Sequence, residues 1–148
     1  MRISAKGRYA LASAALMAQQ HRTGETITLI SIADSLGISK IYLEQVFSLL
    51  KRAELVTSVK GAQGGYQLSR MPAQITALDI LAAVELSLFE KTDDTVAEKA
   101  PQIEAALRSA VFDELDGAVR DMLQKITLED LAFEAEKNQS ENAFMFYI

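Results

Sequence analysis

A segment at residues 39–51 places hydrogen-bonding side chains between apolar residues at helical spacing. Leu43, Val46 and Leu50 recur every three or four residues, which is typical of one buried helix face. The polar residues between them must then point away from the core, and they are Ser39, Lys40, Tyr42, Glu44, Gln45, Ser48 and Lys51. Ammonium and amide donors beside carboxylate and hydroxyl acceptors are suited to reading base edges and phosphates in a major groove.

A second helix and a turn must position that segment. Thr28 can cap a short helix that ends at Leu36, where Gly37 permits a left-handed stop. Ala33 is small at the point where two helices would cross. These spacings predict a helix-turn-helix. The alternative is an ordinary helical hairpin in a core, and we favour DNA binding.

A glycine-rich hairpin is predicted directly after this unit. Residues 56–60 are rich in β-branched side chains, residues 61–65 form a turn, and residues 66–68 return as a strand. Lys60 can offer a cation to the adjacent minor groove, while Gly61 and Gly64 let the turn approach a sugar–phosphate backbone. A phosphate-binding loop is disfavoured, because its Gly-Lys-Ser/Thr ending is missing. The hairpin is therefore interpreted as a wing.

The charge is divided between the two halves of the chain. The net charge is −5, yet residues 1–70 carry nine Lys or Arg and four Asp or Glu, and residues 71–148 carry six and sixteen. A basic half is typical of a nucleic-acid partner. We add Arg2, Ser4, Lys6 and Thr28 to the predicted DNA-binding residues.

The residue types exclude several classes of chemistry. Without cysteine, and with His21 as the single histidine, the chain lacks the donors for disulfides, thiol catalysis and thiolate or imidazole metal sites. We predict no enzyme activity, no metal and no cofactor. Basic residues before the apolar residues 9–18 are similar to a short signal peptide, but Ser13 interrupts them. We favour the first helix of a cytoplasmic protein, with no membrane partner.

A long helix is predicted near the other end, at about residues 101–126. Its apolar residues repeat every three or four positions, and they include Ile103, Leu107, Val111, Leu115 and Met122. This face is wider than a small domain needs, so we predict a homodimer interface rather than a long core helix. The predicted organisation is a DNA-binding domain at residues 1–86, followed at residues 87–148 by an acidic loop, the dimerisation helix and a tail.

Three segments carry a family resemblance: residues 2–10 (RISAKGRYA), 42–45 (YLEQ) and 61–66 (GAQGGY). They resemble the Rrf2 family of dimeric winged helix-turn-helix regulators. The resemblance implies recognition-helix roles for Ser39, Tyr42, Glu44 and Gln45, and a wing cation at Lys60. Many relatives have arginine there, and lysine lacks arginine's planar fork, so a weaker and less base-selective contact is expected.

The chain departs from the metal-sensing branch of that family. Relatives in that branch have three cysteines between the helix near Val84 and the long helix, where this chain has none. Residues 127–131 (TLEDL) and the closing FYI are similar to the cysteine-free branch. That branch includes repressors of cysteine metabolism, so the resemblance implies a repressor of sulfur or cysteine genes at palindromic operators on double-stranded DNA. A repressor with another effector, or an interaction module that has lost DNA binding, remains an alternative.

The apolar tail has two interpretations. Phe146, Tyr147 and Ile148 could fold back onto the dimer, or they could bind a partner. The resemblance implies cysteine synthase as that partner, because repressors of the cysteine-free branch associate with this enzyme. A terminal isoleucine offers a carboxylate and an apolar side chain to one pocket.

Overall fold

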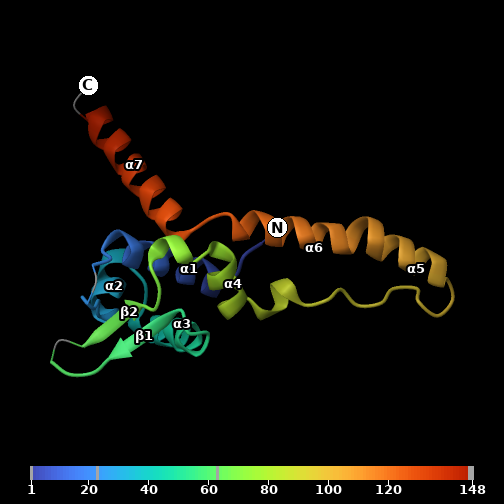
Figure 1. Cartoon of the computed structure of the whole chain (residues 1–148), viewed down its shortest axis with the longest axis horizontal. Coiled ribbons are helices and arrows are strands. Elements are labelled where there is room, and N and C mark those ends of the chain that lie inside the picture. Colours follow the sequence, from blue (N-terminus) through green and yellow to red (C-terminus); the bar gives the residue numbers. More distant parts are fainter. Residues whose placement is uncertain (1, 23, 63, 147–148) are drawn as a thin grey trace.

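The computed structural model describes residues 2–22, 24–62 and 64–146, which form a mostly helical fold with one β-hairpin (Figure 1). The first half contains α1 (Ala5–Gln19), α2 (Leu29–Leu36), α3 (Lys40–Arg52), β1 (Val56–Val59), β2 (Gly65–Leu68) and α4 (Ala77–Val84). The second half contains α5 (Pro101–Leu107), a π-helical turn (Arg108–Phe112), α6 (Asp113–Gln124) and α7 (Leu128–Phe146). Short 3-10 turns occupy Pro72–Gln74 and Leu86–Phe89. The predicted fold class, mostly helical with a small hairpin, is confirmed.

A serine or threonine side chain caps the start of each of the first three helices, and the cap Thr28 of α2 is the one predicted above. Ser4, Thr28 and Ser39 each accept a hydrogen bond from the backbone N–H three residues later, at 3.2, 3.1 and 3.4 Å. Such a cap satisfies one of the N–H groups that a helix start leaves unpaired. Gly37 ends α2 in the left-handed conformation with φ of 66°. The turn between α2 and α3 therefore has the predicted chemistry.

One hydrophobic core joins the helices to the hairpin. Its largest fully buried side chains include Phe47, Ile32, Leu43, Leu50 and Ile80. The hairpin is antiparallel, with Val56 opposite Leu68 and Val59 opposite Gly65. The segment before α2 extends this ladder, because Ile27 and Tyr66 exchange backbone hydrogen bonds of 2.9 and 2.8 Å. The hairpin is thus fastened to the helix-turn-helix as well as to itself.

The second half extends from this body as a long helical arm, formed by α5, the π-helical turn and α6 (Figure 1). Its α6 end is anchored on α4 by Leu123, which is buried with Ala77 and Leu81. The other end lies far from the body, and the segment leading into α5 runs outward from the body alongside the arm. In the described part of the chain, no helix is both long and apolar enough to cross a membrane.

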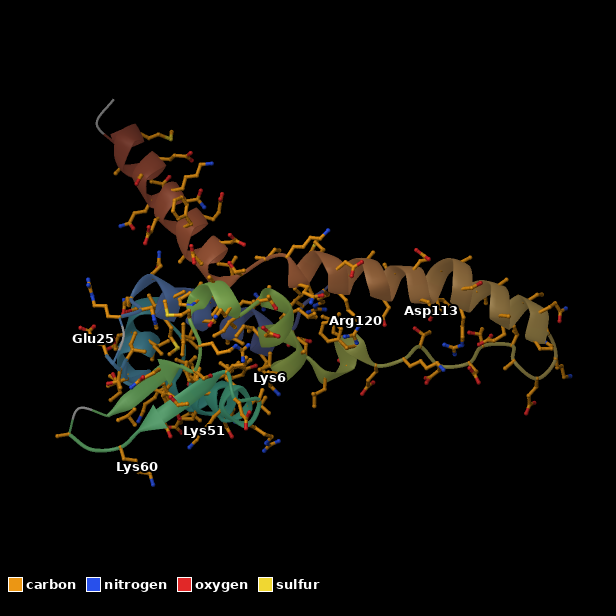
Figure 2. The ribbon with its side chains drawn as sticks, in the orientation of Figure 1. Lys6, Glu25, Lys51, Lys60, Asp113 and Arg120 are labelled. Carbon is orange, nitrogen blue, oxygen red and sulfur yellow. The ribbon has the colours of Figure 1, made fainter. Side chains whose placement is uncertain are left out.

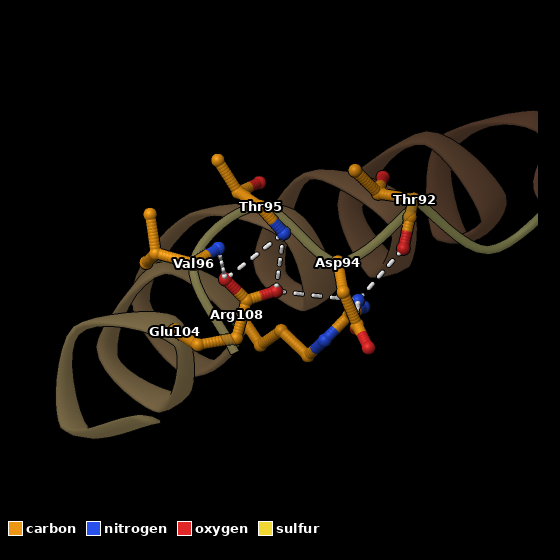
Figure 3. Close-up of polar contacts among 6 residues, drawn as sticks. All are labelled: Thr92, Asp94, Thr95, Val96, Glu104 and Arg108. Atoms are coloured by element: carbon orange, nitrogen blue, oxygen red, sulfur yellow. Dashed lines mark hydrogen bonds and ion pairs between the residues drawn. The ribbon is translucent and has the colours of Figure 1, made fainter. Parts of the chain in front are cut away.

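A buried carboxylate fastens the segment between α4 and α5 to the arm. Glu104 is 6% exposed and accepts hydrogen bonds from the backbone N–H groups of Thr95, at 3.0 Å, and Val96, at 2.9 Å. Arg108 approaches the same carboxylate to 3.7 Å, and its Nη2 also pairs with Asp94 at 2.6 Å (Figure 3). The acidic segment expected as a loop is a loop at residues 90–100, after the 3-10 turn at Leu86–Phe89, and this network holds it.

The capping sequence at residues 127–130 (TLED) predicts the start of a short last helix, and the observed helix α7 is longer. It begins as predicted: Thr127 and Asp130 form reciprocal capping bonds of 3.0 and 2.9 Å. It then continues to Phe146 and leads away from the body (Figure 1). Leu128 at its start is fully buried in the main core, and its N–H donates to the Ile75 carbonyl at 2.9 Å. The division into domains at residue 86 stays a prediction.

Replacing Glu104 with alanine should loosen the segment that leads into α5. The N–H groups of Thr95 and Val96 would lose their acceptor, so we expect the free energy of unfolding to fall by about 1–3 kcal/mol. Hydrogen exchange at these two amides should also accelerate. Denaturant unfolding and exchange mass spectrometry measure both effects. Exposed Glu98→Ala is the matched control, and unchanged exchange at residues 95–96 in Glu104→Ala would contradict this role.

Candidate nucleic-acid interface

Helix α3 has one fully buried side and one exposed side. Leu43, Val46, Phe47 and Leu50 are 0% exposed. Of the polar residues predicted to face DNA on this segment, those that the structure leaves exposed are Ser39, Lys40, Glu44, Gln45, Ser48 and Lys51. Their side chains are thus free to enter a groove, as the spacing predicts. An ion pair of 3.6 Å joins Lys40 to Glu44 one turn later.

Tyr42 is placed differently from its neighbours. It is half-buried, and its ring meets the ring of Tyr9 edge to face, with centroids 5.2 Å apart. Aromatic pairs of this geometry stabilise the contact between their helices, here α3 and α1. Tyr42 therefore has a packing role in this structure, and its predicted contact with DNA stays a prediction.

The wing lies beside α3 because of an aromatic contact. Tyr66 of β2 packs on Phe47 of α3, with ring centroids 4.9 Å apart. Lys60 lies at the exposed end of β1, on the same side of the body as Lys51 (Figure 2). The structure therefore brings the predicted wing cation and the exposed side of α3 onto one surface.

The predicted glycines are needed by the turn of the wing. Gly61 has φ of 112°, a conformation that other residues rarely adopt. A Cβ at Gly64 would lie 2.5 Å from the Val59 carbonyl oxygen, so a side chain there would displace the backbone. Both glycines belong to the tight closure of the hairpin. Their predicted approach to a sugar–phosphate backbone stays a prediction.

The predicted N-terminal residues lie around the start of α1. Arg2 is exposed and Lys6 is half-buried. Ser4 uses its hydroxyl as the cap of α1 and donates it to the buried carboxylate of Glu85, which also accepts the Ser4 N–H at 3.0 Å. Ser4 thus links α1 to the end of α4. Thr28 is exposed and caps α2, so both hydroxyls act locally in this structure.

Two exposed residues of α3 were absent from the predicted set: Ile41, which is 71% exposed, and Arg52. Counting about 100° per residue from the buried side would have placed both on the opposite side of the helix. A search limited to polar groups passes over an isoleucine, and Arg52 lies one residue beyond the predicted segment at 39–51.

The residues predicted for dimerisation form an apolar row along the arm. Four of them are about half exposed: Ile103 at 51%, Val111 at 49%, Leu115 at 59% and Met122 at 57%. Leu107 is partly buried.

The predicted partner tail cannot be placed in full. Tyr147 and Ile148 lie outside the described residues, and the side chain of Phe146 is not described.

This geometry defines the class of protein. A capped helix-turn-helix, a wing packed on its second helix and exposed hydrogen-bonding groups on that helix make a winged helix-turn-helix DNA-binding regulator. The profile of the Rrf2 family, described as "Iron-dependent Transcriptional regulator", matches residues 3–134. The chain belongs to the Rrf2 family.

Similar proteins agree with this class. The HTH-type transcriptional regulator CymR of Bacillus subtilis is 39% identical over the whole length of both chains. The regulator IscR of Vibrio cholerae is 34% identical over 92% of this chain and 78% of its own. The solved structure titled "The Structure of CymR (YrzC) the Global Cysteine Regulator of B. subtilis" superposes with a TM-score of 0.72 and 36% identity, over 90% of this chain and 98% of that one. The relatives are regulators rather than enzymes.

The donor set does not fit the metal that the family description implies. The chain has no cysteine to hold an iron–sulfur cluster. Among the described residues, no group of three His, Asp or Glu side chains is arranged to hold a metal ion. Glu104 lies after the segment where metal-sensing relatives have cysteines, and its carboxylate is occupied by backbone N–H groups. No step of DNA binding is therefore derived through iron.

Replacing Lys60 with alanine should weaken binding to DNA of every sequence. One cation fewer at the wing releases fewer counterions, so we expect affinity to fall about three- to tenfold and the salt dependence to become shallower by about 1 in slope. Fluorescence anisotropy at several salt concentrations measures both. Lys91→Ala, also exposed but in the acidic half, is the control. Unchanged affinity and slope would contradict the wing assignment.

Glu44→Ala in the same titrations should change sequence preference more than affinity. A carboxylate on the exposed side of α3 can accept a hydrogen bond from a cytosine amino group. Removing it should relax discrimination at one base pair per half-site. Competition assays with single-base variants of a bound site measure the relative affinity at each position. Discrimination equal to that of the native protein at every position would remove Glu44 from base readout.

Proposed function

We propose that this protein is a transcriptional repressor that binds palindromic operators as a homodimer and controls genes of sulfur or cysteine metabolism. The observation that carries the proposal is the shared surface of α3 and the wing, with Lys51 and Lys60 on it (Figure 2). A regulator that covers a promoter with this surface blocks transcription without chemistry. The physiological target is supported by the 39% identity to CymR, for which a solved structure is titled "Global Cysteine Regulator".

Genome-wide mapping of bound DNA in the native host tests the proposal. We expect peaks at promoters of sulfur or cysteine genes, each with an inverted repeat, and higher transcription of those genes when the protein is deleted. Peaks at other gene classes would indicate a repressor with a different effector. Failure to bind any promoter fragment at low salt would favour an interaction module without DNA binding.

The apolar row on the arm supports the dimer. Large apolar side chains on a protein surface are ordinary when single, but a continuous row of them marks an interaction site. Here Ile103, Val111, Leu115 and Met122 follow one helix that projects beyond the body. A second copy of the arm could cover this row and set two α3 helices on adjacent turns of DNA, about 34–36 Å apart or a multiple of that.

Replacing Leu115 with glutamate should separate the protomers. The side chain is 59% exposed in the single chain, so the change should cost little in folding, but an interface would bury an unpaired charge. We expect light scattering to give twice 16.2 kDa for the native protein and 16.2 kDa for the variant, with a large loss of operator affinity. Neighbouring Glu114→Gln serves as the control. A native monomer that binds its operator with full affinity would overturn the dimer.

The tail is the second contact surface that we propose, with cysteine synthase as its partner. The course of α7 supports this assignment, because it carries the chain away from the body and leaves Met145 74% exposed (Figure 1). Residue Ile148 follows this helix in the sequence, and its apolar side chain is the group that we propose the enzyme's pocket accepts.

Deleting Ile148 should abolish binding to the cysteine synthase of the host, as measured by calorimetry. The shortened chain would lack the isoleucine side chain that we propose the apolar pocket accepts. Circular dichroism and DNA binding should stay unchanged, since DNA contacts lie on α3 and the wing. Undiminished binding would eliminate tail insertion, and loss of folding would instead support a tail that packs on the dimer.

A further inference from the structure

Ile41 has the most unusual position among the large apolar side chains that the structure leaves exposed. It is 71% exposed and lies in the first turn of α3. Single apolar residues on a surface are common and need no explanation by themselves. What makes this one informative is that it lies on the helix whose exposed side reads DNA, among side chains that are otherwise polar or charged.

The position of Ile41 on α3 is at the centre of the exposed side. With about 100° per residue, Ile41 lies opposite the mean direction of the four fully buried residues of this helix. Gln45, Ser48 and Arg52 follow it at intervals of four, three and four residues and continue the same row. Ile41 is thus the N-terminal residue of this exposed row. In a recognition helix the N-terminal residues are the ones that contact base edges.

The neighbours of Ile41 define its chemistry further. Lys40 and Glu44 lie to one side of it and pair with each other at 3.6 Å. Ile41 follows Lys40 in the chain and carries only ethyl and methyl groups, which have no donor or acceptor. Its χ1 is confined largely to one rotamer, because a β-branched side chain in a helix has little choice. An apolar group of fixed direction is therefore presented between polar ones.

Only one group on the major-groove edge of a base pair matches an apolar side chain, and it is the 5-methyl group of thymine. We propose that Ile41 selects thymine at one position of each half-site by contact with this methyl group. The selection has two parts. The methyl contact favours thymine, and the side chain would strip water from the amino group of cytosine or from O6 and N7 of guanine without replacing the lost hydrogen bonds. This inference rests on the proposed DNA binding and names the base that it reads.

Replacement of thymine by deoxyuridine tests the contact, because it removes the methyl group and leaves every hydrogen-bonding group in place. Sites selected from a random DNA library by the full-length native protein supply the probes, and each thymine is replaced singly. We expect one position per half-site where deoxyuridine weakens native binding by about three- to fivefold, the effect of one buried methyl group. In Ile41→Ala the same replacement should have no effect.

Ile30→Ala is the matched control, since Ile30 is also an exposed isoleucine, at 57%, but lies on α2. This variant should keep the native loss on deoxyuridine replacement. The proposal is overturned if deoxyuridine is tolerated at every position, if Ile41→Ala keeps the native loss, or if Ile41→Ala weakens all sequences equally, which would place Ile41 on the sugars. Failure to select any site would overturn the proposed DNA binding itself, and this inference with it.

Discussion

Burial of one side of α3 is the constraint on which the candidate nucleic-acid interface depends. Leu43, Val46, Phe47 and Leu50 have no exposed surface, and a helix that is fixed on one side has every other side chain fixed in direction. The same packing sets the wing, because Phe47 also contacts Tyr66 of β2 at 4.9 Å. One set of apolar contacts thus decides both which groups α3 leaves exposed and where the wing lies beside it.

The remaining architecture keeps opposite charges apart. The body holds the basic half of the chain, and much of the acidic half lies on the arm, where Asp113 is far from Lys60 (Figure 2). A net charge of −5 is therefore no obstacle to binding a polyanion, since screening limits charge effects to about 8–10 Å. The arm projects from the body, so it must be held together by contacts within itself. Glu104 of α5 provides such contacts by accepting hydrogen bonds from Thr95 and Val96. These two residues belong to the segment where metal-sensing relatives have cysteines.

Much of the fold could be predicted from sequence, because it depends on interactions within a few residues. A cap such as Ser39 or Thr28 satisfies an N–H group three residues later, and Gly37 stops a helix through its own backbone freedom. The hairpin was placed to within one residue, since a glycine-rich turn between β-branched segments is a local signal. The same holds for the exposed polar residues of α3, whose direction follows from the spacing of the apolar ones.

The sequence by itself therefore determined the order of the elements, the helix-turn-helix with its wing and most of the polar groups on its surface. Tertiary structure alone decided the packing of Tyr42 on Tyr9, the burial of the Glu85 carboxylate under Ser4, and the network around Glu104. The physical reason is the separation of the partners. Ser4 and Glu85 are 81 residues apart, and no local pattern reports which distant group will satisfy a buried carboxylate.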